Sequence, residues 1–199
     1  YSFSQFLKRF SIVKEEMHID LDEFDLSYYT YGMSIYKNMP LIEPLETKEV
    51  KKIYEFVIVL DTSYSIDEEL AKRFLSNTYS ILSTSNMFYK SCKVHIIQCD
   101  DRIRKDDVIS NQNEMDRLLN SFTLVGGGNT DFRPVFSYVN DLIDQKVFQN
   151  LCGLLYFTDG KGIYPKKSPA YKTAFIYLED YDRSKVPSWA IQYRLEEKL

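Results

Sequence analysis

The chain has few of the residues that build zinc sites and disulfide frameworks. Among its 199 residues are two histidines, His18 and His95, and three cysteines, Cys92, Cys99 and Cys152. The cysteines are odd in number and contain no Cys-x-x-Cys pair, and neither histidine has a second histidine four residues away. These absences argue against structural zinc and against a disulfide framework. Because free cysteines persist in reducing compartments, we expect a cytoplasmic protein.

Clustered positive charge and long apolar runs are also missing. The formal net charge is -4, and no run is rich in Lys or Arg. A nucleic-acid partner is therefore not expected, because phosphate binding needs a clustered basic face. No apolar run approaches the roughly 18 residues of a membrane span, and no signal peptide opens the sequence, so no membrane association is expected. Since the first residue is Tyr1 rather than Met, we expect the sequence to be a piece of a longer protein.

From Tyr54 onward, strand-like and helix-like segments alternate. The apolar runs 56–60 and 154–157 are typical of strands buried on both faces of a sheet. Apolar spacing predicts helices at 66–82, at 113–121 and from Arg133-Pro134 onward, and further strands at 93–98, 103–109 (an edge strand), 174–178 and 190–193. This alternation predicts a mostly parallel sheet flanked by helices on both faces, a Rossmann-like α/β fold.

The sequence divides into two parts. Residues 50–199 are interpreted as the α/β domain, and residues 1–49 have a different pattern. In the latter, Phe3 to Phe10 place apolar side chains on one helix face, an acidic stretch follows, and Pro40 and Pro44 mark a loop before the first strand. A segment of this length is too short for an independent domain. It is either an extension that packs on the α/β domain or the tail of an upstream domain.

Oxygen-bearing side chains gather where the predicted strands end, at the edge where open α/β sheets bind ligands. They are Asp61, Ser63 and Ser65 after the strand 56–60, Thr130 in the loop after Gly126-Gly127-Gly128, and Asp159 after the strand 154–157. Two carboxylates and three hydroxyls suit an octahedral Mg²⁺ or Mn²⁺ at about 2.1 Å, and the lack of sulfur and imidazole disfavours zinc and copper. Few charged ligands would leave the ion one open position for an outside carboxylate.

This set resembles the metal-ion-dependent adhesion site of von Willebrand factor A (VWA) and integrin inserted domains. The pattern is Asp-x-Ser-x-Ser after a buried strand, Thr in a glycine-rich loop, and Asp-Gly after a later strand, and all five positions match over about three quarters of the chain. The resemblance implies direct metal binding by Ser63, Ser65 and Thr130, with Asp61 and Asp159 acting mostly through water. One departure is Tyr64, which stands where a small glycine is common.

A second resemblance concerns the segment before Asp61. The strings Tyr31-Gly32-Met33 and Pro40-Leu41-Ile42-Glu43-Pro44 are similar to a bacterial family in which a VWA-like domain ends a metallopeptidase-type protein. That resemblance implies association with an AAA ATPase of the MoxR type. The family's His-Glu-x-x-His zinc motif is not present, so its peptidase activity is not carried over to this chain.

The main hypothesis is a Mg²⁺-dependent protein–protein interaction module, not an enzyme, whose ion takes a Glu or Asp from a partner. One alternative is a Mg²⁺-dependent hydrolase or phosphotransferase, and another is an interaction domain with a vestigial metal site. Catalysis lacks support because no nucleophile–base pair involving His or Cys is visible. A general base would have to be Asp131 or Asp100, with nothing evident to raise its pKa.

Several local features have simpler interpretations. Ser65 and Glu68 match a helix capping box, and Asp131 matches a helix N-cap better than a metal ligand. Asp100-Asp101 is either a second acidic site or a solvated turn, and we favour the turn; His95 is predicted to be a histidine of the core or sheet face. The glycine run 126–128 lacks the Gly-Lys-Ser/Thr of a phosphate-binding loop and is predicted to be flexible. Lysines 161, 166 and 167 are expected to be solvated, near enough to the site to attract an acidic partner.

Overall fold

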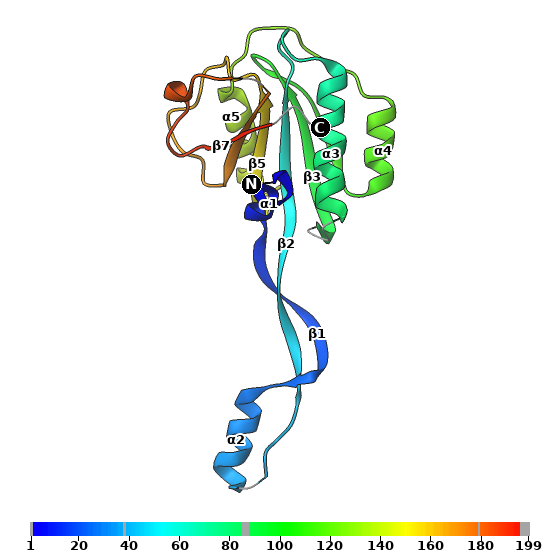
Figure 1. The fold of residues 1–199 in the computed structure, drawn as a ribbon, viewed down its shortest axis with the longest axis vertical. Coiled ribbons are helices and arrows are strands. Elements are labelled where there is room, and N and C mark those ends of the chain that lie inside the picture. The colour runs from blue at the N-terminus through cyan, green and yellow to red at the C-terminus, as the bar shows by residue number, and fades with distance from the viewer. Residues whose placement is uncertain (1, 38, 85–87, 179, 196–199) are drawn as a thin grey trace. The chain divides into compact units, whose positions relative to one another are not determined.

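The computed structural model describes residues 2–37, 39–84, 88–178 and 180–195 (Figure 1). The chain forms two compact units. One comprises Tyr1–Ser11 with Ile53–Leu199, and the other comprises Ile12–Lys52. The long strand β2 (Pro44–Asp61) contributes its first half to the smaller unit and its second half to the larger one.

The larger unit is built on a sheet with the strand order β4-β3-β2-β5-β6-β7. Its other strands are β3 (Phe88–Cys99), β4 (Ile103–Ile109), β5 (Leu151–Thr158), β6 (Thr173–Tyr177) and β7 (Ile191–Arg194). Only the edge pair β3–β4 is antiparallel among the pairs in this order, so the predicted mostly parallel sheet and its edge strand are confirmed. β2 lies between β3 and β5 because its run Phe56–Leu60 is fully buried and apolar on both faces.

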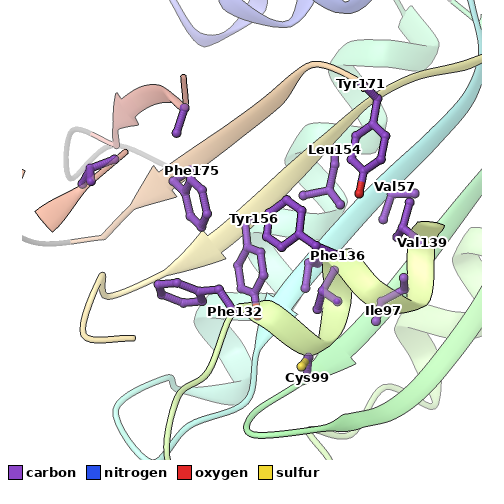
Figure 2. Packing of buried hydrophobic residues seen from close by; sticks show 14 of the residues in the cluster. Val57, Ile97, Cys99, Phe132, Phe136, Val139, Leu154, Tyr156, Tyr171 and Phe175 are labelled. Carbon is purple, nitrogen blue, oxygen red and sulfur yellow. The ribbon is translucent and has the colours of Figure 1, made fainter. Parts of the chain in front are cut away.

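Helices cover both faces of this sheet. On one face, α5 (Arg133–Asp144) packs Val135 and Val139 into a cluster with Val57 and Phe175 (Figure 2). On the other face, Phe74 of α3 (Glu68–Thr84) stacks on Phe157, with ring centroids 4.1 Å apart. Successive side chains of a strand point to opposite faces of the sheet, so the apolar strands present apolar side chains to the helices on both faces. Each fully buried side chain of this size contributes about 1.5–3 kcal/mol.

Two further helical segments complete the larger unit. α4 (Gln112–Asn120) begins at the N-cap Asn111 and buries Met115 and Leu118, close to the predicted bounds. The predicted N-terminal helix is present as α1 (Phe3–Leu7) followed by the 3-10 turn η1 (Lys8–Phe10), and a second 3-10 turn, η2 (Arg183–Lys185), precedes β7. Phe10 lies edge-on to Phe56 and so close to Gly153 that any side chain at position 153 would clash with its ring. The N-terminal aromatic face is therefore part of the α/β core.

The start of α3 differs from the predicted capping box. The helix begins at Glu68, and the Asp67 carboxylate accepts the Leu70 backbone N–H at 3.3 Å, which is the hydrogen bond of an N-cap. Ser65 instead donates its hydroxyl to Asp159, and Glu68 accepts the Leu124 N–H at 3.0 Å. The capping-box prediction was wrong because Ser65 and Glu68 both form hydrogen bonds with residues that are distant in the sequence.

The smaller unit is a long hairpin that carries a helix. β1 (Ile12–Phe24) pairs antiparallel with the first half of β2, from Ile12↔Lys52 to Phe24↔Pro44. Between the strands lies α2 (Leu26–Tyr36), whose first turn is capped by Asp25 through the Ser27 N–H at 2.7 Å. This hairpin was not anticipated from the sequence, and the side chain of His18 on β1 lies outside the described residues.

Within the described part of the chain, no helix is long and apolar enough to cross a membrane.

The three cysteines are free and buried, as predicted. Burial raises the pKa of Cys92 and of Cys99 to about 12, so neither forms an appreciable amount of thiolate near neutral pH.

We expect Cys92 and Cys99 to resist iodoacetamide at pH 8 in the folded protein. In guanidinium chloride both thiols should react quickly, because their pKa returns to about 8.5 in an unfolded chain. Timed labelling followed by peptide mass spectrometry measures each site separately. Labelling of the native protein at the unfolded rate would show that these thiols are not held in the core.

Candidate metal centre

The site begins with a buried carboxylate at the end of β2. Asp61 has no exposed surface. Its Oδ1 accepts the Ser63 backbone N–H at 2.9 Å, and its Oδ2 accepts the Thr158 hydroxyl at 2.6 Å. Burial raises the pKa of Asp61, and the nearby charge of Asp159 acts in the same direction. A bound cation would offset this cost of holding negative charge away from water.

Two serine hydroxyls and a second carboxylate are joined to each other in front of Asp61. The Ser63 Oγ and Ser65 Oγ atoms lie 3.1 Å apart, and Ser65 donates to Asp159 Oδ2 at 2.6 Å. Adjacent ligands of an octahedral Mg²⁺ at about 2.1 Å are separated by about 3.0 Å, which is the spacing of these hydroxyls. The donors present therefore fit a small hard cation.

Lys161, two residues after Asp159 in the chain, also holds the Asp159 carboxylate in place. Its Oδ1 accepts the Lys161 backbone N–H at 3.0 Å, and the Lys161 ammonium lies 3.4 Å from Oδ2. The side chain of Asp159 is 6% exposed, whereas that of Lys161 is 70% exposed. Asp159 thus faces Ser65 with its carboxylate held by a backbone N–H, while the exposed Lys161 ammonium lies at its outer side.

Thr130 reaches this edge by a separate route. The segment of residues 123–131, named here the Thr130 loop, ends where the Asp131 backbone forms a parallel bridge with Ile163. The Thr130 methyl lies so close to Gly162 that a Cβ at position 162 would be 2.7 Å from it. Thr130 is therefore placed beside the segment that follows Asp159. The hydrogen bonds given above join Asp61, Ser63, Ser65 and Asp159 and do not include Thr130.

The Thr130 loop is pinned rather than freely flexible, contrary to the prediction for the glycine run. Gln98 on β3 accepts the Val125 N–H at 2.7 Å and donates to the Thr123 carbonyl at 3.0 Å. The Gly127 N–H donates to the Thr62 carbonyl at 2.8 Å. Gly127 adopts φ 111°, a conformation that strongly favours glycine. Hydrogen bonds thus anchor the loop to the ends of both β2 and β3.

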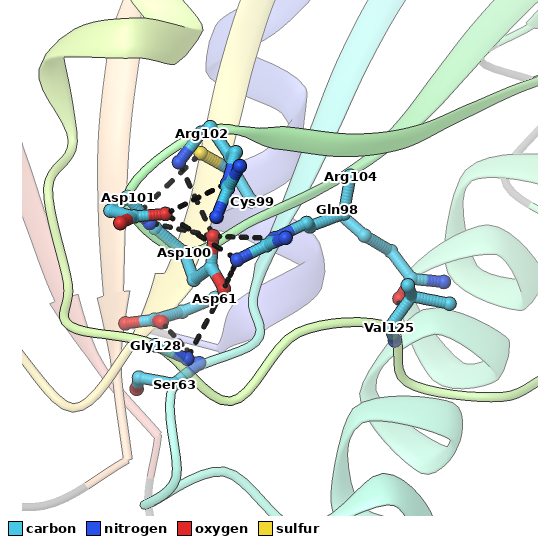
Figure 3. A network of polar contacts seen from close by, with 10 residues as sticks. All are labelled: Asp61, Ser63, Gln98, Cys99, Asp100, Asp101, Arg102, Arg104, Val125 and Gly128. Atoms are coloured by element: carbon cyan, nitrogen blue, oxygen red, sulfur yellow. Dashed lines mark hydrogen bonds and ion pairs between the residues drawn. The ribbon is translucent and has the colours of Figure 1, made fainter.

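Asp100 was predicted to lie in a solvated turn, but it is fully buried. Its carboxylate receives two bonds from Arg104, Nε to Oδ1 at 2.8 Å and Nη2 to Oδ2 at 2.7 Å, and one from the Gly128 N–H at 3.2 Å (Figure 3). Burial alone would raise the pKa of Asp100, but the hydrogen bonds from Arg104, Arg102 and Asp101 lower it below its ordinary value. Asp101 is exposed, as predicted for a turn.

Asp131 faces the start of α5. Its Oδ1 accepts the Arg133 backbone N–H at 3.0 Å. The N-cap of α5 is nevertheless Phe132, so the predicted N-cap position of Asp131 was wrong by one residue, although its side chain does bind the first helical N–H. The Arg133 guanidinium also binds it, with Nη2 2.6 Å from Oδ2, and this contact lowers the pKa of Asp131. Asp131 and Asp100 are therefore both poor general bases, which weakens the hydrolase alternative.

Two other features of the site have a clear place in the fold. The Tyr64 ring is 91% exposed and lies over Gly127, 3.4 Å from the position that a Cβ there would occupy. His95 is buried on β3 as predicted, where Nδ1 lies 3.0 Å from the Asp106 carboxylate.

Among the described residues, no group of three or more His, Cys, Asp or Glu could hold a metal ion. The proposed set differs from such groups because it combines the carboxylates of Asp61 and Asp159 with hydroxyls.

Sequence reasoning missed the residues that support the site. They are Thr158, Gln98, Asp100 and Arg104. Gln98 could have been noticed as an amide inside the apolar strand 94–99, and Arg104 as the cation four residues after Asp100. Nothing in the sequence shows that Asp100 reaches Gly128, because that contact spans 28 residues.

We predict that Asp61→Asn raises the stability of the protein when divalent cations are absent. The pKa of Asp61 is raised in the folded state, so the wild type loses stability as pH rises from its unfolded pKa through its folded one. An amide removes this penalty, and the advantage of the variant should be larger at pH 8 than at pH 4. Urea unfolding in EDTA at the two pH values measures it. A variant that is less stable at pH 8 would contradict the prediction.

Comparisons with known proteins agree with this architecture. A family model described as "VWA-like domain (DUF2201)" matches residues 56–196. The structure of "von Willebrand factor type A from Catenulispora acidiphila" superposes with a TM-score of 0.52 at 9% identity, covering 76% of this chain and 40% of that one. The SpRpn10 VWA domain gives a TM-score of 0.51 at 8% identity, covering 72% and 88%.

No curated protein sequence matches the chain. At these identities the two structures support the fold alone, which is the VWA-type Rossmann-like α/β fold. The family match covers well over half of the sequence and includes Asp61, Ser63, Ser65, Thr130 and Asp159. The chain therefore belongs to the family of VWA-like domains, DUF2201.

Proposed function

We propose that this chain is a protein-interaction module that depends on Mg²⁺ or Mn²⁺. VWA-like domains are commonly protein-interaction modules. The observation that carries the metal dependence is the pair of hydroxyls of Ser63 and Ser65, 3.1 Å apart and backed by two carboxylates. The proposed metal residues are Asp61, Ser63, Ser65, Thr130 and Asp159.

The proposed metal residues have two kinds of role, direct binding by hydroxyls and binding through water by carboxylates. Ser63, Ser65 and Thr130 would bind the ion directly through neutral oxygens. Both oxygens of Asp61 already accept hydrogen bonds, so this carboxylate would act mostly through water. Asp159 would do the same while orienting Ser65. The ion supplies a Lewis-acidic position that is open to one more oxygen ligand.

The surroundings favour a carboxylate as that ligand. Lys161 lies beside Asp159 with most of its side chain in water, and lysines 166 and 167 follow a few residues later. With mostly neutral direct ligands, a divalent ion would add positive charge to this edge and attract an acidic group. The exposed Tyr64 ring stands at the rim and would admit a protruding side chain more readily than a flat surface. The partner would thus present a Glu or Asp on a loop.

The partner and the context follow from the family resemblance rather than from the fold. We propose a partner of the AAA ATPase class, of the MoxR type, and a place for this module at the end of a larger bacterial protein in the cytoplasm. A catalytic role for the described chain is not proposed, because its candidate bases Asp100 and Asp131 have lowered pKa values.

The first prediction concerns the ion. Titration calorimetry should detect Mg²⁺ and Mn²⁺ binding of modest affinity, since the direct ligands are neutral hydroxyls. Asp61→Ala and Thr130→Ala should weaken binding by about tenfold or more, as expected for changes in or next to a metal's ligand set. Asp141→Asn, which alters an exposed carboxylate on α5, is the matched control. Equal binding by wild type and Asp61→Ala would place any bound ion elsewhere.

The second prediction separates a working metal site from a vestigial one. Thr130→Ala and Asp159→Ala should abolish capture of a partner in Mg²⁺, and EDTA should have the same effect on wild type. Circular dichroism should show that both variants remain folded, because the site lies at the sheet edge rather than in the core. Substituting the acidic loop residues of a captured partner singly should reveal one position whose loss removes the Mg²⁺ dependence.

Two outcomes would contradict this mode of binding. Capture that persists undiminished in EDTA would favour an interaction domain with a vestigial site. A scan in which every acidic substitution in the partner leaves Mg²⁺-dependent capture intact would rule out a carboxylate as the final ligand.

A further inference from the structure

The Thr130 loop carries the only proposed metal ligand that is remote from the ends of β2 and β5. The hydroxyls of Ser63 and Ser65 are placed by the turn after β2, and Asp159 by the end of β5. Thr130 lies at the far end of a nine-residue loop, so its position depends on what fixes that loop. A ligand displaced by an ångström cannot complete an octahedral shell at Mg²⁺ distances.

The end of β3 fixes the loop at three places. The Gln98 side chain binds both the Val125 N–H and the Thr123 carbonyl. The Asp100 carboxylate accepts the Gly128 N–H at 3.2 Å, and the Asp100 backbone carbonyl accepts the Asp131 N–H at 3.0 Å. The two contacts of Asp100 thus bracket Thr130 on either side in the sequence. No other residue in the described chain is hydrogen-bonded to the loop on both sides of Thr130.

Asp100 can hold the loop because Arg104 holds Asp100. The guanidinium makes two short bonds to the carboxylate, a geometry that fixes the plane of the acceptor group as well as its distance. The N–H groups of Asp101 and Arg102 also bind Oδ1, at 2.7 and 3.2 Å. Gly128 approaches closely enough that a Cβ there would lie 3.0 Å from Oδ2. A buried carboxylate that receives five N–H donors is an anchor with one defined orientation.

We propose that Asp100, oriented by Arg104, is a positioning residue that sets the place of Thr130 in the metal centre. This role rests on the proposed metal-dependent function, because it concerns a ligand of the same ion. The end of β3 supplies no metal ligand, but through Asp100 it would control the affinity of the site for the metal ion. Asp100 acts through the Gly128 and Asp131 amides and does not bind the ion itself.

The test compares Asp100→Asn with Asp141→Asn, the same change on an exposed side chain of α5. An amide at position 100 places its NH₂ group against Arg104 Nε and the N–H groups of Asp101 and Arg102, or against Arg104 Nη2 and the Gly128 N–H. In either orientation the paired contact with Arg104 is broken, so the side chain that holds Gly128 is no longer fixed. Without metal, amide hydrogen exchange at Gly127 and Gly128 should rise by about tenfold or more, while exchange at Ile58 and Leu155 in the core should not change. Mn²⁺ affinity, measured from the electron paramagnetic resonance signal of the free ion, should fall by about 10- to 100-fold.

Arg104→Lys provides a second variant if Asp100→Asn does not fold. Lysine keeps the positive charge but loses the paired geometry, so both effects should be present and smaller. Asp141→Asn should change neither quantity. Unchanged exchange at Gly128 would overturn the anchoring role, and faster exchange with unchanged Mn²⁺ affinity would overturn the link to the metal. Failure of the wild type to bind Mn²⁺ would instead refute the proposed metal centre, and with it this role of Asp100, while the exchange data still decide whether Asp100 anchors the loop.

Discussion

The buried carboxylate of Asp61 is the constraint on which this edge of the sheet depends. A charge at the end of a strand that is fully apolar from Phe56 to Leu60 has no exposed surface, so neighbouring protein groups must supply hydrogen bonds to it. The Ser63 N–H and the Thr158 hydroxyl provide them, and each ties the end of β2 to a neighbouring segment. Beside this pair, the Ser65 hydroxyl lies 3.1 Å from that of Ser63 and donates to Asp159.

Supporting interactions extend this arrangement from β2 to both neighbouring strands. Thr158 on β5 binds Asp61 and also accepts the Gly160 N–H, which shapes the turn that presents Asp159. On the other side, Asp100 after β3 binds the loop that carries Thr130. Three adjacent parallel strands therefore each end in a polar residue that orients the next segment. Burial of Asp61 and Asp100 costs free energy, and the hydrogen bonds offset that cost only while the whole edge is intact.

Local patterns in the sequence were enough to predict the α/β unit, because its strands and helices have strong apolar periodicity. The run 56–60 and the spacing of Val135 and Val139 identify a central strand and a buried helix face before any contact is known. The hairpin of β1 and the first half of β2 could not be predicted in this way. Its strands contain runs such as Lys14-Glu15-Glu16 and Lys48-Glu49, whose charges hide the strand period.

The site shows the same division between local and long-range information. The grouping of these polar side chains could be predicted because Asp61, Ser63 and Ser65 are neighbours in sequence, and Asp159 follows a recognisable strand. The capping box failed because Ser65 bonds to a residue 94 positions away, which no local pattern can weigh against a helix cap. The prediction of a solvated turn at Asp100 was wrong for a related reason. A carboxylate after a strand is normally solvated, and only the fold brings Arg104 and Gly128 to it together. Motif recognition thus identifies which atoms could bind an ion, whereas the rigidity of those atoms is set by contacts between elements that are distant in sequence.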